Sequence, residues 1–214
     1  MTITVIGDNT GNDFAGTEDT KLREVEPTVN FGTAIETEIT KYGAGDHSHT
    51  VIKFSGLSNI TPPVTVNSAT ISIRQNANGG GTHTLSMYRL LRTWVEGQAT
   101  WNIYSTSNNW QTAGGLGAND RSSTLSAAAT SAAPDGYKTW SAAQLATDHQ
   151  NIINGVNPND GWHTERTDGL NDANYRVLDT SEATDGNRPY TTVDHVPSGS
   201  ATNPGWYSNA GGWF

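Results

Sequence analysis

The sequence predicts an all-β protein, an antiparallel β-sandwich of jelly-roll type with one short helix. The first observation is composition: Thr 30, Gly 23, Asn 20 and Ser 17 make up 90 of the 214 residues, and these residue types compete poorly for helix interiors. The second is that seven Trp, seven Tyr and four Phe supply the apolar area that a disordered polar chain lacks. The third is a series of short alternating segments separated by turn residues, which is typical of a sandwich or barrel.

Strict alternation of apolar and polar residues marks the expected strands, because successive side chains of a strand point to opposite faces. In the first half of the chain such segments span residues 35–39, 50–54, 69–73 and 84–88. Clusters rich in Gly, Pro, Asn and Asp separate them at residues 43–46, 61–63 and 76–81. Strand character returns at residues 161–164, 175–178 and 190–193.

One segment predicts a helix. Ser141 and Gln144 have the spacing of a capping box, in which each side chain satisfies a free backbone N–H at the start of a helix. Leu145, Ile152 and Ile153 then fall on one helical face. Gly155 suits the left-handed position that ends a helix. We therefore expect a helix over residues 141–154, lying across an end of the sandwich.

Charge and composition exclude several classes of partner. The formal net charge is −9, and the twelve Lys and Arg residues are scattered, so no basic stripe for nucleic acid is expected. No apolar run reaches the roughly 18 residues that a membrane helix needs, and membrane insertion is not expected. Residues 1–7 lack the positively charged N-terminal region that is typical of a signal peptide. The absence of cysteine excludes disulfides and thiolate metal sites.

Catalytic and metal-binding patterns are weak. No G-x-S-x-G, H-E-x-x-H or phosphate-binding glycine loop occurs, so the protein is not expected to be an enzyme. His47 and His49 would share one face of a strand, but zinc needs further ligands, and a solvated strand start is the favoured interpretation. No cofactor is expected, apart from a structural Ca²⁺ that loop carboxylates could hold, against a default of free surface carboxylates. The candidates are Asp120, Asp135, Asp160 and Asp185.

Several segments carry a family resemblance. Residues 27–32 have the form P-x-x-N-F-G, residues 94–101 read W-V-E-G-Q-A-T-W, and residues 110–115 continue this signature. Residues 175–189 close the pattern, in the same order and with the same spacing. Over residues 19–195 the chain resembles the DNRLRE domains, a β-sandwich group that overlaps carbohydrate-binding module family 96 and the disaggregatase-related repeats. Residues 162–166 are more polar than the family's usual strand after the helix, so a wetter sheet edge is expected there.

The resemblance also implies roles for individual residues. Trp94 and Trp101 lie inside the signature and are expected to be structural core, whereas Trp110 is left open between core packing and stacking on a sugar ring. Arg92 and Glu96 are expected to brace the signature through a charge-assisted hydrogen bond. If the module binds a glycan, the expected residues are the loop aromatics and two cations for carboxylates: Tyr104, Trp110, Arg121 and Lys138.

Members of this family accompany secreted enzymes or occur in cell-surface and virion proteins. The leading expectation is a non-enzymatic virion surface protein, a bacteriophage capsid decoration or fibre protein that contacts other virion proteins or copies of itself. The alternative is a stand-alone extracellular carbohydrate-binding module for an acidic polysaccharide, such as alginate or a host-surface polymer. The expected organisation is an N-terminal arm (1–16), the sandwich (17–195) and an aromatic tail (196–214). The tail carries the expected assembly residues Trp206, Tyr207, Trp213 and Phe214.

Overall fold

The computed structural model describes residues 1–7, 16–43, 45–169 and 172–198, and the statements below concern these residues. Short strands dominate the chain, as the composition predicts. The strands are β1 (Thr2–Ile6), β2 (Thr17–Arg23), β3 (Glu36–Lys41), β4 (His47–Phe54), β5 (Val64–Asn78), β6 (His83–Leu90), β7 (Ile103–Ser105), β8 (Asn108–Asn109), β9 (Arg121–Ser131), β10 (Gly136–Ser141), β11 (Trp162–Arg166), β12 (Asp172–Asp179) and β13 (Tyr190–Pro197). A 3₁₀ turn, η1 (Ser55–Asn59), and one helix, α1 (Ala143–Ile153), complete the described elements.

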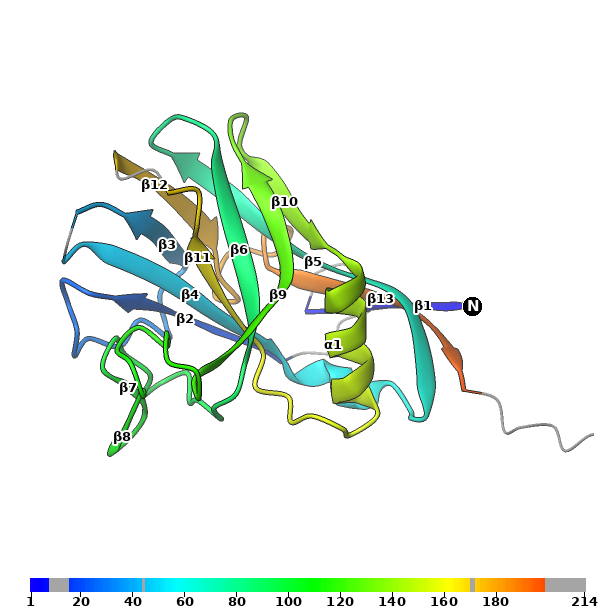
Figure 1. Cartoon of the computed structure of the whole chain (residues 1–214). Coiled ribbons are helices and arrows are strands. Elements are labelled where there is room, and N and C mark those ends of the chain that lie inside the picture. The colour runs from blue at the N-terminus through cyan, green and yellow to red at the C-terminus, as the bar shows by residue number, and fades with distance from the viewer. Residues whose placement is uncertain (8–15, 44, 170–171, 199–214) are drawn as a thin grey trace, which may run out of the picture.

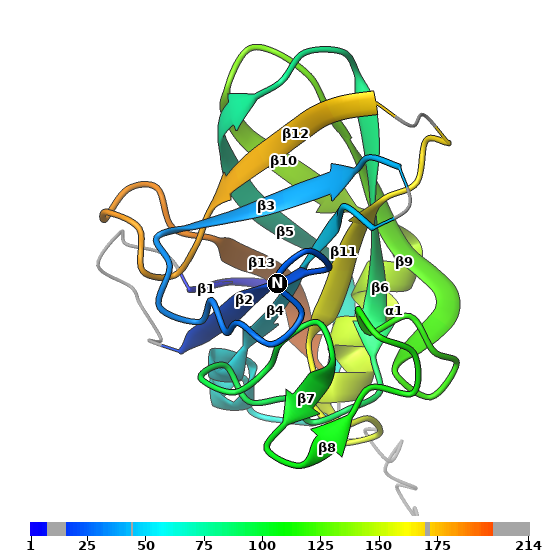
Figure 2. The same cartoon turned by 90° about the vertical axis from the view of Figure 1, so that its left-hand side faces the viewer.

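Eleven of these strands form a single antiparallel sheet. Its order is β1-β13-β5-β12-β3-β4-β11-β6-β9, with β10 also paired to β5 and β2 also paired to β4. The sheet curls so that its two halves face each other (Figure 1), and β3, β4, β11 and β12 cross one side of the molecule above the small β7–β8 hairpin (Figure 2). The predicted fold class, an antiparallel β-sandwich with one short helix, is confirmed.

The main core fills the space between the two halves of the sheet. Alternate residues of β4 and β5, among them Ile52, Phe54 and Ile71, point into it together with Trp140 and Trp162. Helix α1 packs against β5, β9 and η1 (Figure 1). The His149 ring of α1 stacks on Trp162 at 4.7 Å between centroids, so the helix closes the sandwich by burying its inner face.

A second apolar cluster lies under residues 91–120, which we call the signature loop. Its members are Leu22, Val51, Leu90, Trp94, Ala99, Trp101 and Trp110. Trp94 is 1% exposed, and its indole Nε1–H donates to the Asp160 carbonyl at 2.8 Å. Trp101 is also buried. The prediction that Trp94 and Trp101 belong to the core is therefore confirmed.

The start of the helix differs from the prediction. Ser141 is the last residue of β10, where it pairs with Thr70, and α1 begins two residues later with Ala142 as its N-cap. No side chain caps this end, and Gln144 Nε2 instead donates to Asp148 Oδ1 at 2.9 Å. The capping-box prediction is wrong because sheet pairing holds Ser141 in an extended strand. The other end agrees, since Gly155 has a φ of +71°.

Three further differences concern strands. β7, β8, β9 and β10 were not predicted from the sequence. β11 is not a wet edge but lies between β4 and β6, with Trp162, His163 and Thr164 buried. Thr2–Ile6 pairs with β13, so part of the expected N-terminal arm belongs to the sheet. The four aromatic residues expected to drive assembly, Trp206, Tyr207, Trp213 and Phe214, lie outside the described residues.

In the described part of the chain, no helix combines the length and the apolar character that crossing a membrane requires.

Candidate functional site at the signature loop

The signature loop is held rigidly against the sheet by polar side chains. Asn30 Nδ2 donates to the carbonyls of Glu96 at 2.6 Å and Ala99 at 2.8 Å. At the other end of the loop the buried Asp120 carboxylate accepts the backbone N–H groups of Gln111, Thr112 and Gly117, at 2.8–3.0 Å. A loop with its backbone tied at both ends can present a binding surface with little loss of conformational entropy.

Arg92 and Glu96 brace this loop through separate partners. Arg92 Nε lies 3.6 Å from Asp120 Oδ1, and the Arg92 guanidinium lies over the Tyr104 ring at 5.5 Å. Glu96 Oε1 accepts the backbone N–H of Asp19 at 2.7 Å. Glu96 therefore has the structural role that the sequence predicted, through the backbone of Asp19. Arg92 and Glu96 do not share a bond, and the contact of Arg92 with Asp120 is longer than a hydrogen bond.

A hollow of about 420 Å³ opens on the signature loop, and we call it the aromatic hollow. Its lining residues are Thr28, Thr100, Asn102, Ile103, Asn109, Trp110 and Ala113. Trp110 is only 4% exposed, and its Nε1–H donates to the Thr100 carbonyl at 2.9 Å. The Tyr104 ring packs on Trp110 at 5.5 Å between centroids. The hollow thus has a fixed aromatic base, with the exposed amides of Asn102 and Asn109 at its rim.

This arrangement suits a polyhydroxylated ligand. The carboxamides of Asn102 and Asn109 each offer two N–H donors and one carbonyl acceptor, which match the mixed donor and acceptor character of hydroxyl groups. The apolar edges of Trp110 and Ile103 can cover the C–H groups of a sugar ring. Within the described residues, no carboxylate lines this hollow.

Only two of the four predicted sugar-binding residues lie close together in the structure. Tyr104 and Trp110 pack together at the aromatic hollow, and Trp110, which the sequence left open between core packing and sugar stacking, is buried. Lys138 lies on β10, away from β7 and β8 (Figure 1), with its ammonium donating to the carbonyls of Ala132 and Pro134 at 2.7 and 2.9 Å. Arg121 belongs to a different cluster.

That cluster is a circular arrangement of polar side chains beneath the signature loop, which we call the histidine ring. Arg121 Nη2 donates to Glu165 Oε1 at 2.8 Å, and Arg121 Nη1 donates to His163 Nδ1 at 3.1 Å. His163 Nε2 in turn lies 3.1 Å from His49 Nδ1 and 3.0 Å from the Gly114 carbonyl. The ring stays open between His49 Nε2 and Glu165 Oε2, which face each other at 3.9 Å.

The charges of Arg121 and Glu165 determine the tautomers of this ring. A guanidinium only donates, so His163 Nδ1 is an acceptor and its proton sits on Nε2. His163 Nε2–H then points at the Gly114 carbonyl and at His49 Nδ1. His49 Nδ1 also lies 3.2 Å from the Gly114 carbonyl, but the negative charge of Glu165 opposite His49 Nε2 favours the tautomer with the His49 proton on Nε2. Burial lowers the pKa of His49 to about 4 and that of His163 well below its ordinary value. Both imidazoles are therefore neutral at pH 7.

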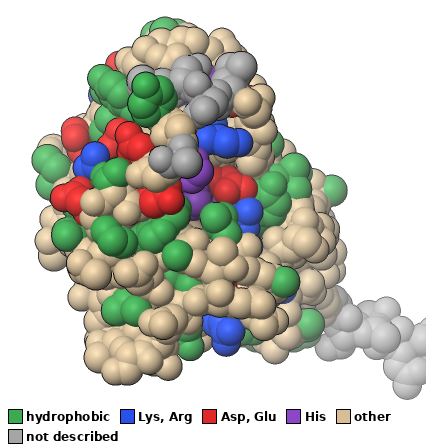
Figure 3. All heavy atoms as spheres, turned by 60° about the vertical axis from the view of Figure 1, so that its left-hand side comes forward, with side chains coloured by type: hydrophobic (Ala, Val, Ile, Leu, Met, Phe, Trp, Pro, Cys, Tyr) green, Lys and Arg blue, Asp and Glu red, His purple; other side chains and the backbone are tan. Residues whose placement is uncertain are grey.

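A second hollow, of about 270 Å³, opens beside the histidine ring, and we call it the histidine hollow. Its lining residues are Thr40, Lys41, His47, His49, Leu116, Glu165, Arg166 and Thr167. Figure 3 shows histidine side chains within a depression on this face, with acidic and basic side chains on either side. His49 at the start of β4 is buried, so the predicted solvated strand start holds only for His47.

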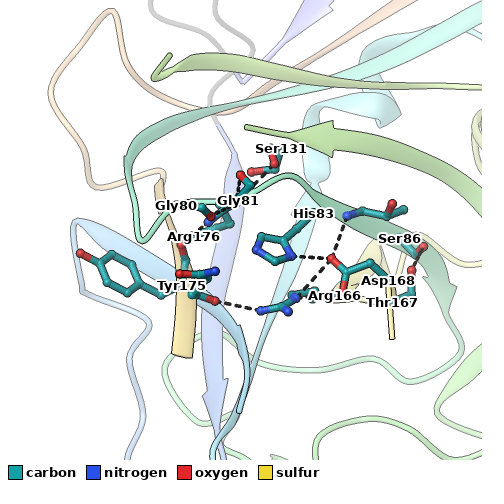
Figure 4. A network of polar contacts seen from close by, with 12 residues as sticks. Gly80, Gly81, His83, Ser86, Ser131, Arg166, Thr167, Asp168, Tyr175 and Arg176 are labelled. Carbon is teal, nitrogen blue, oxygen red and sulfur yellow. Dashed lines mark hydrogen bonds and ion pairs between the residues drawn. The ribbon is translucent and has the colours of Figure 1, made fainter. Parts of the chain in front are cut away.

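The buried arginine of this hollow is already neutralised. Arg166 Nε donates to the Asp168 carboxylate at 3.1 Å, and its Nη1 donates to the Asn174 carbonyl at 3.0 Å (Figure 4). The same carboxylate receives His83 Nδ1–H at 2.6 Å and the backbone N–H of Thr84 at 3.2 Å. This network fills the interior end of the sandwich.

The four aspartates considered for calcium each have separate partners. Asp120 takes backbone N–H groups, and the buried Asp160 accepts the Thr93 hydroxyl at 2.8 Å, so these two are not free surface carboxylates. Asp135 accepts from Gln75 and Asn78, and Asp185 pairs with Arg188 at 2.9 Å. Over the described ranges, no three His, Asp or Glu side chains gather as metal ligands.

His163 and Glu165 were not predicted as site residues. The signal was present in the alternation of β11, which places His163 and Glu165 on one face and Trp162 and Thr164 on the other. What the sequence does not show is that β4 and β9 bring His49 and Arg121 to the same place.

Comparison with known proteins gives one family assignment. No curated protein matches the chain significantly. The sequence profile of carbohydrate-binding module family 96 matches residues 11–151, a stretch that contains the whole signature loop and all lining residues of the aromatic hollow. The chain belongs to carbohydrate-binding module family 96.

Proposed function

We propose that the protein is a non-catalytic module that binds a polysaccharide at the aromatic hollow. The observation that carries this proposal is the pairing of a buried, hydrogen-bonded Trp110 with the exposed amides of Asn102 and Asn109 around one opening. Membership of a carbohydrate-binding family supports the class of ligand. Sugar recognition commonly combines an apolar surface for C–H groups with amides for hydroxyls.

An acidic polysaccharide is the ligand that we favour. Arg92 supplies the charge, because its guanidinium lies over Tyr104 beside the aromatic hollow and its side chain is 35% exposed. A guanidinium can donate two parallel hydrogen bonds to a carboxylate. Its distance of 3.6 Å from Asp120 leaves donor positions for such a group.

The test is a calorimetric titration with defined oligosaccharides, both neutral and uronate-containing. Replacing the rim amides in an Asn102→Ala, Asn109→Ala double variant is expected to weaken binding about tenfold or more, since each lost hydrogen bond is worth about 0.5–1.5 kcal/mol. Asn67→Ala, an exposed asparagine on β5, is the matched control and should bind as the wild type does. Absence of wild-type binding to every oligosaccharide, or full binding by the double variant, would refute the proposal.

We also propose the setting in which this module works, which is the outer surface of a virion, as a capsid decoration or fibre protein. The acidic balance and the absence of cysteine support an exposed, disulfide-free surface component. In this proposal the sandwich of residues 17–195 binds the glycan and the aromatic residues of 196–214 mediate assembly. Removing residues 199–214 should leave glycan binding intact and lower the mass of any oligomer measured by light scattering. An unchanged oligomeric mass would count against the assembly role.

A further inference from the structure

The histidine hollow contains two polar groups that face each other without meeting. Glu165 Oε1 is committed to Arg121 at 2.8 Å, whereas Glu165 Oε2 faces His49 Nε2 at 3.9 Å. This separation is too long for a hydrogen bond. In the described part of the chain neither atom has another hydrogen-bond partner.

The protonation states make these two atoms a matched donor and acceptor. The tautomer that Arg121 and Glu165 favour leaves His49 Nε2 as an N–H donor, while the carboxylate of Glu165 only accepts. One hydroxyl oxygen placed between them can accept from His49 and donate its own proton to Glu165. The gap of 3.9 Å is wide enough for such a bridge, because each hydrogen bond would then be about 2.7–3.0 Å long.

The same hollow also offers a cation and two hydroxyl groups. Lys41 and the hydroxyl-bearing Thr40 and Thr167 line the same hollow. The charge of Arg166 is balanced by Asp168, and that of Glu165 by Arg121. The ammonium of Lys41 is therefore the cation that remains for a ligand oxygen among the described lining residues.

We propose that the histidine hollow is a second carbohydrate site, in which His49, Glu165 and Lys41 bind the vicinal diol of one sugar residue. The first hydroxyl bridges His49 Nε2 and Glu165 Oε2, and its neighbour accepts from the Lys41 ammonium. This proposal extends the proposed function to a separate site. Ala113 lines the aromatic hollow and Leu116 lines the histidine hollow, so residues 113–116 of the signature loop separate the two.

The histidine ring prepares this site before the ligand arrives. His163 and Arg121 are held from β11 and β9. His49 Nδ1 accepts from His163 Nε2–H at 3.1 Å, and the His49 ring packs on Trp101 at 5.1 Å between centroids. Little side-chain freedom is left to lose on binding, which favours recognition of a small ligand.

The experiment follows the imidazole signals of the full chain by NMR while methyl glycosides are added. The probes are the methyl pyranosides of glucose, galactose and mannose, with tetrahydropyran-2-methanol as the ring compound that lacks a vicinal diol. At least one glycoside is expected to shift the signals of His47 and His49 in a saturable manner. His83, His149 and His195 lie outside the hollow and act as internal references.

Two substitutions give the proposal its sharpest test. Glu165→Gln removes the acceptor charge and should weaken the saturable shift at least fivefold. Lys41→Met should weaken it as well, and it carries the test if Glu165→Gln does not fold. Glu36→Gln, at the opposite end of β3 from Lys41, is the matched control and should behave as the wild type does.

Three results would overturn the proposal: no saturable histidine shift with any glycoside, an equal shift with tetrahydropyran-2-methanol, or an undiminished shift in the folded Glu165→Gln and Lys41→Met variants. Because the readout is the histidine signals, these results are distinct from failure at the aromatic hollow, which calorimetry of the Asn102 and Asn109 variants reports.

Discussion

At the scale of single residues, Asp19 shows how burial changes the chemistry of a carboxyl group. It is 2% exposed on β2, and its Oδ2 accepts the backbone N–H of Ser181 at 2.7 Å. Burial is the largest cause that raises the pKa of Asp19 to about 8, and the neighbouring Glu182 and Glu96 add to the rise. At neutral pH the carboxyl group is therefore mostly protonated in the folded protein.

Asp19→Asn should remove a pH dependence of stability. In the wild type the unfolded chain loses the Asp19 proton near pH 4, whereas the folded chain keeps it to about pH 8, so rising pH favours unfolding over this range. The free energy of unfolding of the asparagine variant, relative to that of the wild type, should increase by about 1.4 kcal/mol per pH unit between pH 5 and 8. Urea unfolding at both pH values measures it. Asp185→Asn, at an exposed carboxylate, is the control, and a constant difference for Asp19→Asn would contradict the prediction.

Trp94→Ala tests the core under the signature loop. The substitution removes a fully buried indole and leaves the Asp160 carbonyl without its donor. A loss of about 3–5 kcal/mol in the free energy of unfolding is expected, as for other buried aromatic truncations. Val95→Ala, at a neighbouring side chain that is 40% exposed, should cost far less. Equal stability of the two variants in chemical denaturation would show that the cluster is not core.

The residues that could be predicted from sequence were those with local signals. Trp94 and Trp101 stand at fixed positions within one short motif, so their burial followed from that motif. The contacts of Asp19 with Ser181 and of His49 with His163 join residues 162 and 114 positions apart. No local pattern contains such a pair, because only the order of strands in the folded sheet brings the two side chains together.

At the scale of elements, periodicity predicted the strands that bear large apolar side chains on one face. It missed β9, whose sequence is RSSTLSAAATS. Its buried positions include Ser126, Ala127, Ala129 and Ser131. Helix α1 and strand β10 both pack against β9, so small side chains fit there and an alternation of large apolar residues is absent.

The uncapped start of α1 offers a stabilising substitution. Ala142 has an extended backbone (φ −165°, ψ 162°), is exposed, and makes no side-chain bond to the free N–H groups of the first turn. Ala142→Asp should raise the free energy of unfolding by about 1 kcal/mol, through a capping hydrogen bond and the helix dipole. Ala142→Asn keeps the capping bond without the charge and separates the two contributions. A thermal midpoint at or below that of the wild type in both variants would show that this end gains nothing from a cap.

At the scale of the whole molecule, β4 joins the two apolar clusters. Ile52 and Phe54 point into the main core, and Val51 points into the cluster under the signature loop. The histidine ring adds a polar contact, since His163 Nε2–H donates to the Gly114 carbonyl of that loop at 3.0 Å. The loop that carries the aromatic hollow is therefore part of the cooperative structure of the sandwich, and the stability of the sandwich limits the conditions under which ligand can bind.

The buried titratable groups set those conditions and predict a maximum of stability near pH 7. Burial lowers the pKa of His49 and of His149 to about 4 and that of His163 well below 6.5. Below about pH 6.5 these three histidines become protonated in the unfolded chain but stay neutral in the folded protein. Falling pH therefore favours unfolding. Asp19 acts in the opposite sense. Three histidines outweigh one carboxyl on the acid side, whereas above pH 7 Asp19 makes the main contribution to the pH dependence. Free energies of unfolding measured in urea from pH 4.5 to 8.5 should rise and then fall.

Asp19→Asn should flatten the alkaline side alone, and His149→Gln should make the acid side less steep. A profile that rises steadily to pH 8.5 would contradict the raised pKa of Asp19, and one that is flat below pH 6 would contradict the neutral, buried histidines.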